Sequence, residues 1–471
     1  MIFKRLFDIK LAQASYLIGC PESGEALVID PNRSLDRYLR AAAEDHLRIA
    51  HVTETHIHAD FVSGARELAR RTGARLYLSG MGGADWQYDF ASEANTSLLE
   101  DGSRFSVGRV VLDVLHVPGH TPEHLSFLVT DCASAGEPMG ALTGDFIFVG
   151  DVGRPDLLER AVKVQGSMED SARQLYRSLQ RFRALPDYLQ IWPGHGAGSA
   201  CGKALGAVPQ STLGYEKRYN WAFSVADESA FVSAVLAGQP DPPRYFAEMK
   251  RINRSGPRIL GQHARPAKLA VDSMAAVLAD GSPVVDTRAA AAFRRGFLTG
   301  TINIPANRSF TTWSGSLLPY DRKLYLIAED QRIDELVEDM AGVGLDQIEG
   351  YWSPDLLEHP GVKDSLQQLP TIGVSDLADG KRNHVVVDVR AEAEWNAGHI
   401  PGSVNIPLGE LEQRLRELPR DELVVHCQSG GRAAIAASLL RARGFTGVQL
   451  FSGGFAEWCR AGQPSSRLRT A

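Results

Sequence analysis

An internal repeat is the feature that most limits what this chain can fold into. Residues 284–305 and 386–407 share a pattern whose members recur 102 positions apart: Asp286/Asp388, Arg288/Arg390, Gly296/Gly398, Gly300/Gly402, Asn303/Asn405 and Pro305/Pro407. Solenoid repeats recur every ~20–50 residues, so this longer spacing indicates two copies of a small domain. In each copy a short apolar run (284–286 or 385–389) precedes loops and helical patterns, which is typical of an α/β fold.

Proline-containing stretches separate the copies from each other and from the rest of the chain. These stretches, 256–266 and 352–370, are less periodic than their surroundings and predict linkers. We therefore expect three domains, at residues 1–255, 269–358 and 371–465. In the first, apolar runs at 26–30, 110–116 and 126–129 alternate with helical patterns at 35–46 and 64–72, so an α/β fold is expected there as well.

Composition excludes several classes of protein. The 471 residues are 44% hydrophobic and hold no apolar run of ~18 residues, so we expect no membrane span. The net charge of −7 disfavours a general nucleic-acid binder. Five cysteines do not make a disulfide scaffold. Asp8, Lys10 and Gln13 interrupt any leader-like apolar core, so we expect two opening strands and a cytoplasmic protein.

Histidines cluster in the first domain. Seven of the 13 lie between His46 and His124. His56, His58 and Asp60 alternate, so they project to one side of an extended chain. Three further ligand-type residues each follow an apolar run and sit in a glycine-containing turn: His120, Asp145 and His195. Strand ends that present such residues to one point predict a metal site.

These residues resemble the metallo-β-lactamase fold family, whose pattern is H-x-H-x-D-H, then a His, a bridging Asp and a final His. The resemblance covers about residues 1–255 and implies an αββα sandwich. One departure matters: Phe61 stands where the family's two-metal hydrolases have a His that helps to hold the second metal. Since Phe cannot ligate, we expect no complete second site, although Asp60 and His195 remain as its remnants.

The string Thr-His-x-His-Ala-Asp, with Gly-Arg-Pro-Asp at 153–156, looks like the persulfide dioxygenase branch of that family. The resemblance implies one Fe(II) per chain, held by His56, His120 and Asp145, with His58 orienting a ligand or water. A two-His, one-carboxylate triad leaves three positions open on iron. Zinc, the alternative metal, prefers a closed tetrahedron and has no redox chemistry.

Two further residues near this motif have alternative roles. Arg154 binds either an anionic substrate tail or a structural carboxylate such as Asp156. Cys201, six residues after His195, is either a packed thiol or a catalytic helper that carries a persulfide in the metal pocket.

A cysteine loop follows an apolar run in the second copy. Residues 423–432 read LVVHCQSGGR and lead into an alanine-rich helical stretch. Backbone N–H groups and the helix dipole would stabilise the Cys427 thiolate, making Cys427 a candidate nucleophile. Arg432 is expected to hold an anionic sulfur substrate, and the loop residues between them to bind it: Gln428, Ser429, Gly430 and Gly431.

This loop resembles that of the rhodanese family, with Asp388-x-Arg390 and Gly398-His-Ile-Pro-Gly402 as further marks. Its C-x4-R spacing is one residue shorter than the C-x5-R of tyrosine phosphatases. The first copy reads YLIAEDQR at 325–332, without a cysteine, so we expect an inactive rhodanese-like domain that serves as a spacer or packing surface.

Together these resemblances imply a bifunctional enzyme of sulfide detoxification. The first domain would oxidise a low-molecular-weight thiol persulfide with dioxygen to sulfite, and the last would convert sulfite to thiosulfate. Two alternatives remain open: a zinc thioester hydrolase resembling glyoxalase II fused to a sulfurtransferase, and a non-enzymatic sulfur relay through Cys427. The expected partners are the persulfide, dioxygen and sulfite, with a homo-oligomeric assembly.

Overall fold

Two units make up the chain in the computed structural model. The structure describes residues 1–162, 167–203, 205–239, 241–261, 265–379, 384–420 and 422–467. Unit 1 consists of Met1–His263 with Ala341–Gly344, and unit 2 of Ala264–Met340 with Leu345–Ala471. The described helices include none that combines the length and apolar character needed for a bilayer span.

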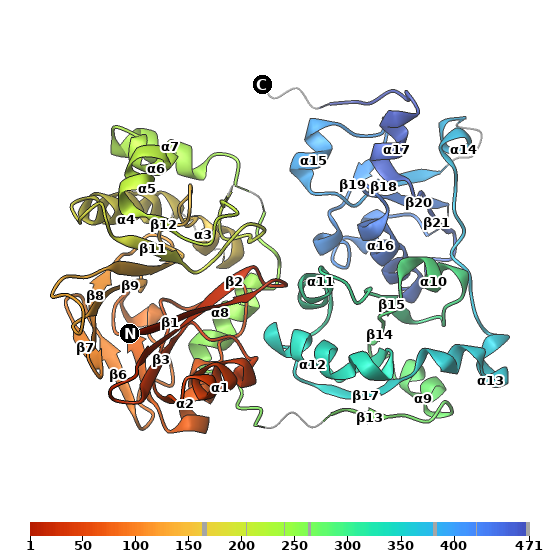
Figure 1. Cartoon of the computed structure of the whole chain (residues 1–471). Coiled ribbons are helices and arrows are strands. Elements are labelled where there is room, and N and C mark those ends of the chain that lie inside the picture. Colours follow the sequence, from red (N-terminus) through yellow and green to blue (C-terminus); the bar gives the residue numbers. More distant parts are fainter. Residues whose placement is uncertain are drawn as a thin grey trace. The chain divides into compact units, whose positions relative to one another are not determined.

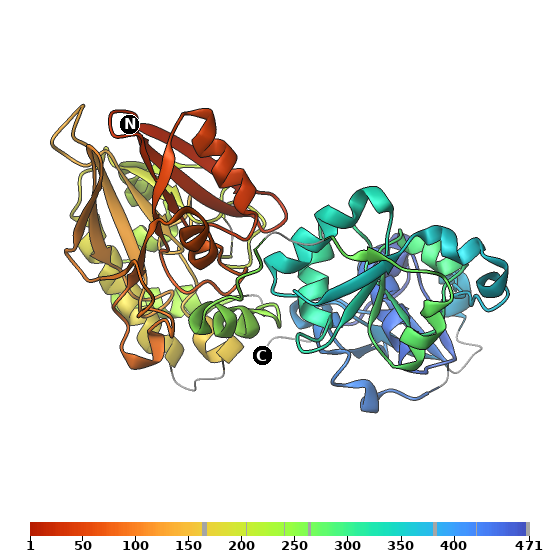
Figure 2. The ribbon, with the colours of Figure 1, turned by 90° about the horizontal axis from the view of Figure 1, so that it is seen from below.

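Unit 1 contains two sheets of six strands each (Figure 1). The first has the order β1-β2-β3-β4-β5-β6, with bounds Ile2–Asp8, Gln13–Cys20, Glu25–Ile29, Arg48–Thr53, Arg75–Ser79 and Thr96–Leu99. The second has the order β12-β11-β10-β9-β8-β7, with bounds, from β7 to β12, of Arg104–Val107, Val110–His116, Leu125–Asp131, Gly140–Gly144, Gln190–Pro193 and Ser211–Thr212. Figure 2 shows the red strands of the first sheet and the orange strands of the second as separate layers.

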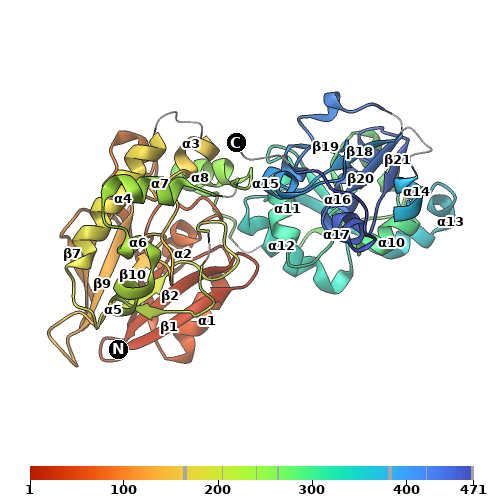
Figure 3. The same ribbon diagram turned by 90° about the horizontal axis from the view of Figure 1, so that it is seen from above.

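Helices cover the outer faces of both sheets. Beside the first sheet lie α1 (Leu35–Glu44) and α2 (Ala65–Thr72). The second sheet is covered by helices from α4 to α7, which gather on one side of the unit in Figure 3. The remaining helices of this unit and their bounds are α3 Leu157–Val162, α4 Ser167–Arg183, α5 Leu213–Tyr219, α6 Trp221–Ser224, α7 Glu228–Leu236, α8 Phe246–Ser255 and the short 3-10 helix η1 Ala84–Trp86.

Alternation along the strands builds three apolar layers. In β2, Leu17 packs towards α1 and α2, whereas Tyr16 and Ile18 face the second sheet. In β10, Leu142 belongs to the layer between the sheets and Ala141 to the layer beneath the outer helices. Successive strand residues point to opposite faces, so a strand covered on both sides is apolar throughout. This is the expected αββα sandwich.

The expected helix at 35–46 is shorter in the structure. It ends at Glu44, because Asp45 caps it and His46 adopts a left-handed backbone with φ of 56°. A helix cannot continue through that conformation. The expected helix at 64–72 begins one residue later, at Ala65, and is followed by left-handed Gly73.

Unit 2 holds the two repeats, each with its own parallel sheet. The first sheet has the order β13-β17-β16-β14-β15 and the second β19-β18-β20-β21. Their bounds, from β13 to β21, are Ala267–Lys268, Val284–Asp286, Thr301–Asn303, Leu324–Ile327, Ile348–Trp352, Val385–Asp388, Val404–Asn405, Leu423–His426 and Val448–Leu450. Their α-helices, from α9 to α17, are Ser273–Ala279, Ala290–Arg295, Phe310–Leu317, Ile333–Gly342, Pro360–Lys363, Val374–Ala378, Glu392–Ala397, Gly431–Ala442 and Gly454–Arg460.

Helix α16 joins the two repeats. Every residue from Ala433 to Leu440 is buried. One side of the helix lies against β20 and β21 of its own sheet, and another against β15 of the first repeat (Figure 1). The Ser438 hydroxyl accepts a hydrogen bond from the Asn303 backbone N–H at 2.9 Å. A helix covered on two sides is apolar nearly all round, which explains its alanine-rich sequence.

Candidate metal centre and cysteine loop

Strand ends place the predicted metal ligands in unit 1. His56 lies in the loop after β4, and Asp145 directly follows β10. His195 comes two residues after β11, which pairs with β10 in parallel. The carboxyl ends of adjacent parallel strands meet at one edge, so Asp145 and His195 become neighbours. His120 lies in the loop between β8 and β9. Ligands more than 130 positions apart in the sequence therefore share one site.

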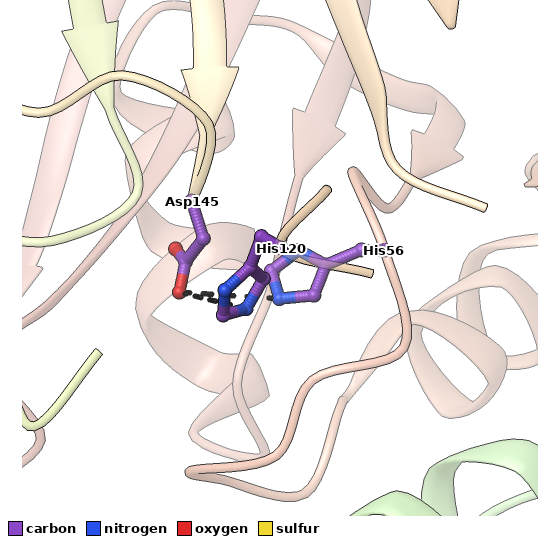
Figure 4. Close-up of side chains that lie close together, drawn as sticks. All are labelled: His56, His120 and Asp145. Carbon is purple, nitrogen blue, oxygen red and sulfur yellow. Dashed lines mark ion pairs between the residues drawn. The ribbon is translucent and has the colours of Figure 1, made fainter. Parts of the chain in front are cut away.

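His56, His120 and Asp145 converge on one point (Figure 4). One potential ligand atom from each lies within 4.8 Å of the others, and all three side chains are buried. The Nε2 atom of His120 lies 3.5 Å from Asp145 Oδ2, and the Nε2 atom of His56 lies 4.0 Å from it. This is a two-histidine, one-carboxylate set of the type that non-haem iron sites use.

Hydrogen bonds orient both histidines for ligation. The Thr55 hydroxyl donates its only hydrogen to Asp30 Oδ2 at 2.9 Å, so it accepts at 2.9 Å from the Nδ1–H of His56. The Nδ1–H of His120 donates to the Arg154 carbonyl at 3.0 Å. Both rings therefore keep an unprotonated Nε2 facing Asp145. An acceptor behind the ring is the usual support of a metal-bound histidine.

The polar atoms at the centre fit a bound cation. Neither carboxylate oxygen of Asp145, nor Nε2 of His56, has a hydrogen-bond partner among the described residues. Burial, reinforced by the neighbouring histidines, holds the pKa of His56 well below its usual range, and burial does the same for His120. Burial raises the pKa of Asp145 to about 6. Neutral imidazoles around an unsatisfied buried carboxylate match a metal ion, because a cation would satisfy these atoms.

A second group of ligand-type side chains lies beside the first. It comprises Asp60, His195 and Cys201, whose ligand atoms lie within 4.8 Å of one another. His195 Nε2 lies 3.2 Å from Asp60 Oδ2 and 3.4 Å from Asp145 Oδ1. Phe61 is fully buried against His58, with ring centroids 4.4 Å apart, so its ring adds no ligand. Asp60 and His195 are the expected remnants of a second site, and Cys201, for which the metal pocket was one of two expected places, lies beside them.

The environments of Cys201 and Arg154 bear on their alternative roles. Cys201 is buried, and its burial, with the nearby carboxylates of Asp145 and Asp60, raises the pKa of the thiol well above its usual value. The thiol therefore stays protonated beside Asp145. Arg154 is completely buried and forms a bidentate pair with Asp156 at 2.8 and 2.7 Å. This pair favours the structural role of Arg154 over contact with a substrate tail.

Asp30 is a site residue that the sequence analysis missed. Its Oδ1 atom lies 3.1 Å from His58 Nε2 and accepts a hydrogen bond from the Thr55 backbone N–H at 2.6 Å. Burial lowers the pKa of His58, but attraction to the carboxylates of Asp30, Glu54 and Asp60 together outweighs burial and raises it to about 9. Asp30 ends the apolar run at 26–30, the same signal that located Asp145. The Nε2 atom of His58 is thus paired with Asp30, while the His58 ring packs on that of His56 with centroids 4.3 Å apart.

The cysteine loop of unit 2 connects β20 to α16. Cys427 is buried directly after β20, and the backbone N–H of Gly430 donates to its sulfur at 3.1 Å. Gly430 has φ of 99°, and a Cβ there would lie 2.3 Å from the Ser452 carbonyl oxygen. Only glycine tolerates that conformation in so close a packing. The loop therefore curls around the sulfur as the pattern predicts.

Polar contacts at the loop differ from those expected. Arg432 is bound by both carboxylate oxygens of Glu394 on α15, at 2.6 and 2.8 Å, which offsets its charge. Glu394 lies 38 positions before Arg432, so the loop motif does not point to it. Gln428 accepts a hydrogen bond from Arg390 at 3.2 Å. Gln428, Ser429 and Gly431 are exposed, so a substrate can reach this side of the loop.

Known proteins resemble both units. Residues 9–195 match the Metallo-beta-lactamase superfamily, and residues 374–461 match the Rhodanese-like domain. Persulfide dioxygenase ETHE1, mitochondrial, of Bos taurus is 29% identical over 200 residues, covering 41% of this chain and 68% of that protein. Hydroxyacylglutathione hydrolase of Methylococcus capsulatus is 32% identical over 180 residues, covering 38% of this chain and 60% of that protein.

A solved structure extends the similarity over most of the chain. The crystal structure of a metallo-beta-lactamase from Staphylococcus aureus is 43% identical and has a TM-score of 0.68. The match covers 75% of this chain and 99% of that one. The chain therefore belongs to the metallo-beta-lactamase superfamily and carries a rhodanese-like domain in its C-terminal part.

Proposed function

We propose that residues 1–255 form a persulfide dioxygenase that uses one Fe(II). The convergence of His56, His120 and Asp145, with their nitrogen lone pairs and carboxylate free for a metal, carries this proposal. Phe61 supports it, because it replaces a ligand on which two-metal hydrolysis depends in related enzymes. The similarity to persulfide dioxygenase ETHE1 supports it as well.

The proposed reaction converts RSSH, O2 and H2O into RSH and H2SO3. Iron would supply the redox chemistry that dioxygen requires and that zinc lacks. The chain's own residues prepare the site: Thr55 and the Arg154 carbonyl fix the histidine tautomers, and the buried walls exclude bulk water. Such fixed supports keep a site from reorganising during reaction.

We further propose that residues 371–465 form an active rhodanese, in which Cys427 is the nucleophile. Its thiolate attacks the outer sulfur of a persulfide, so that an S–S bond forms on Cys427 and the carrier leaves as RSH. Sulfite then attacks that outer sulfur, which releases thiosulfate and restores the thiolate. Gly430 N–H stabilises the anion, and residues 269–358 act as an inactive copy. Joining both steps in one chain raises the effective concentration of sulfite, which suits sulfide detoxification.

A zinc thioester hydrolase is the competing function. The group of Asp60, His195 and Cys201 favours it, because it offers three ligand atoms for a second metal beside Asp145. The similarity to hydroxyacylglutathione hydrolase points in the same direction. The two functions differ in metal content and in the need for dioxygen.

Metal analysis of the protein purified without oxygen separates these functions. We expect about one iron per chain, as a facial triad implies, and oxygen uptake with a thiol persulfide. His56→Ala should abolish both. His51→Ala, a matched change of a half-buried histidine on β4 outside the site, should preserve both. Two zinc ions per chain with thioester hydrolysis would instead establish the competing function.

A further inference from the structure

A pocket of about 790 Å³ borders the loop that carries His56 and His58. Ile57 lines it, and this residue stands between His56 and His58 in the ligand loop. The other walls come from η1, from the loop that carries His120, and from helices α4 and α8. This volume is typical of pockets that hold small organic ligands. A single metal ion held by His56, His120 and Asp145 would not fill this volume.

An unpaired cation lies in this pocket. Lys250 on α8 is only 6% exposed, and its Nζ has no hydrogen-bond partner among the described residues. The ammonium lies 4.2 Å from the centroid of the Trp86 ring. Burial, partly offset by attraction to Glu123, lowers the pKa of Lys250 to about 8. The buried carboxylate of Glu123 is near enough to attract the ammonium, but no described residue accepts a hydrogen bond from it, and a buried ammonium ordinarily has such an acceptor.

The other charged groups of the wall leave this cation available. Arg251 is bound by Glu248 on the same helix. The Nε of Arg254 lies 3.9 Å from Asp89 and is buried without a hydrogen-bond acceptor among the described residues. The acidic residues Asp85, Asp89 and Asp170 are exposed, where water screens their charge. The interior of the pocket thus offers donors, whereas its acids lie at the solvent side.

We propose that this pocket binds the carrier part of the substrate, and that Lys250 receives a carboxylate or phosphate of a low-molecular-weight thiol. The inference rests on the proposed function, because it names the class of thiol that brings sulfur to the metal centre. The carrier's anionic end contacts Lys250, while its apolar part packs on Trp86 and Ile57. Specificity for anionic carriers follows, since a neutral thiol leaves the ammonium without an acceptor.

Binding of unreactive carriers to the metal-loaded full chain tests this inference. We would measure the affinities of S-methylglutathione, its diethyl ester and S-methyl-coenzyme A by calorimetry. Lys250→Gln should weaken at least one anionic probe by about 10- to 100-fold, as expected for a hydrogen bond to a charged group. It should leave the diethyl ester unchanged. The probe that loses affinity identifies the source of the anion, a carboxylate or a phosphate.

Control variants keep the test decisive. Lys250→Arg should retain most of the affinity, which separates loss of charge from loss of folding. Arg177→Gln, an exposed change on α4 away from the pocket, should have no effect. Equal weakening of the neutral and anionic probes, or no weakening of any, would overturn the inference. The probes cannot react, so these outcomes do not depend on whether the enzyme proves to be a dioxygenase or a hydrolase.

Discussion

The two copies of the repeat share a buried polar scaffold. In each, an aspartate ends an interior strand, β14 or β18, and binds an arginine two residues later: Asp286 with Arg288, and Asp388 with Arg390. Each arginine also donates to a glycine carbonyl, at 2.8 Å in the first copy and 2.7 Å in the second. An asparagine in each copy, at 303 or 405, donates to the carbonyls of that aspartate and arginine. The repeated residues of the sequence are thus those that hold the backbone together.

The copies differ in the loop that follows β16 in the first copy and β20 in the second. Cys427 follows β20 directly, whereas Ala328 follows β16. In the second copy Gly430 N–H bonds the sulfur. In the first, the loop continues with Glu329 and Asp330, and Asp330 is paired with Lys268 at 2.8 Å. The same polar network is therefore present in both copies, whereas the loop after β16 or β20 distinguishes them.

The largest expected effect is on thiosulfate formation, when the residue that directly follows β20 is changed. Cys427→Ser should abolish thiosulfate formation from persulfide and sulfite, because the sulfur acceptor is lost. Ala328→Cys, in a background that keeps Cys427, should add no activity, since its loop carries two acids. Persulfide-dependent oxygen uptake should survive both changes. Thiosulfate production that persists in Cys427→Ser would show that the nucleophile lies elsewhere.

Breaking the shared network should destabilise the second copy more than the first. Asp388→Asn leaves a buried guanidinium without its carboxylate, and such a loss costs about 3–5 kcal/mol. Asp286→Asn should cost less, because Arg288 is 17% exposed and Arg390 only 2%. Hydrogen exchange of β18 and β20 amides, compared with β14 and β16, measures both. Equal protection losses in the two copies would contradict this ordering.

The smallest of the three predicted effects is that of pH on the stability of the second copy. Burial, partly opposed by Asp388, lowers the pKa of His426 from its ordinary 6.5. Below pH 6.5 the unfolded chain therefore binds a proton that the folded copy does not. Stability of the second copy should fall on acidification by at most about 1.4 kcal/mol per pH unit.

His426→Ile should remove this acid sensitivity, because the first copy has Ile327 at the end of β16. Exchange of β20 amides between pH 5 and 7, corrected for the intrinsic rates, provides the measurement. An unchanged pH slope in the variant would exclude His426 as its source.

Local patterns predicted the cysteine loop and the strands that coincide with the apolar runs named from the sequence, β3, β8, β9, β14 and β18. The loop comprises consecutive residues between an apolar run and a helix, so its neighbours in space are its neighbours in sequence. The metal residues were also recognisable, because each follows an apolar run, and His120 and Asp145 also sit in glycine-containing turns. The helix boundary at Glu44 was not, since it depends on the backbone conformation of His46.

Partners that come from distant segments escaped the sequence analysis. Asp30 supports the ligand loop from 25 positions away, and Glu394 binds Arg432 from 38 positions away. Cys201 was noticed for its spacing from His195, but its placement with Asp60 depends on how the two sheets pack. The same packing leaves Lys250 buried beside Trp86, although an isolated lysine on an amphipathic helix predicts exposure.

Residue order alone was enough to predict an α/β chain with a duplicated pattern, a cluster of metal-ligand residue types and a cysteine loop. Those features follow from strand periodicity and from contacts within short segments. Only the tertiary structure decided which side chains share a site, which charges are paired and which cation lies unpaired in a pocket. These depend on long-range packing, because burial determines the energetic weight of each charge and hydrogen bond.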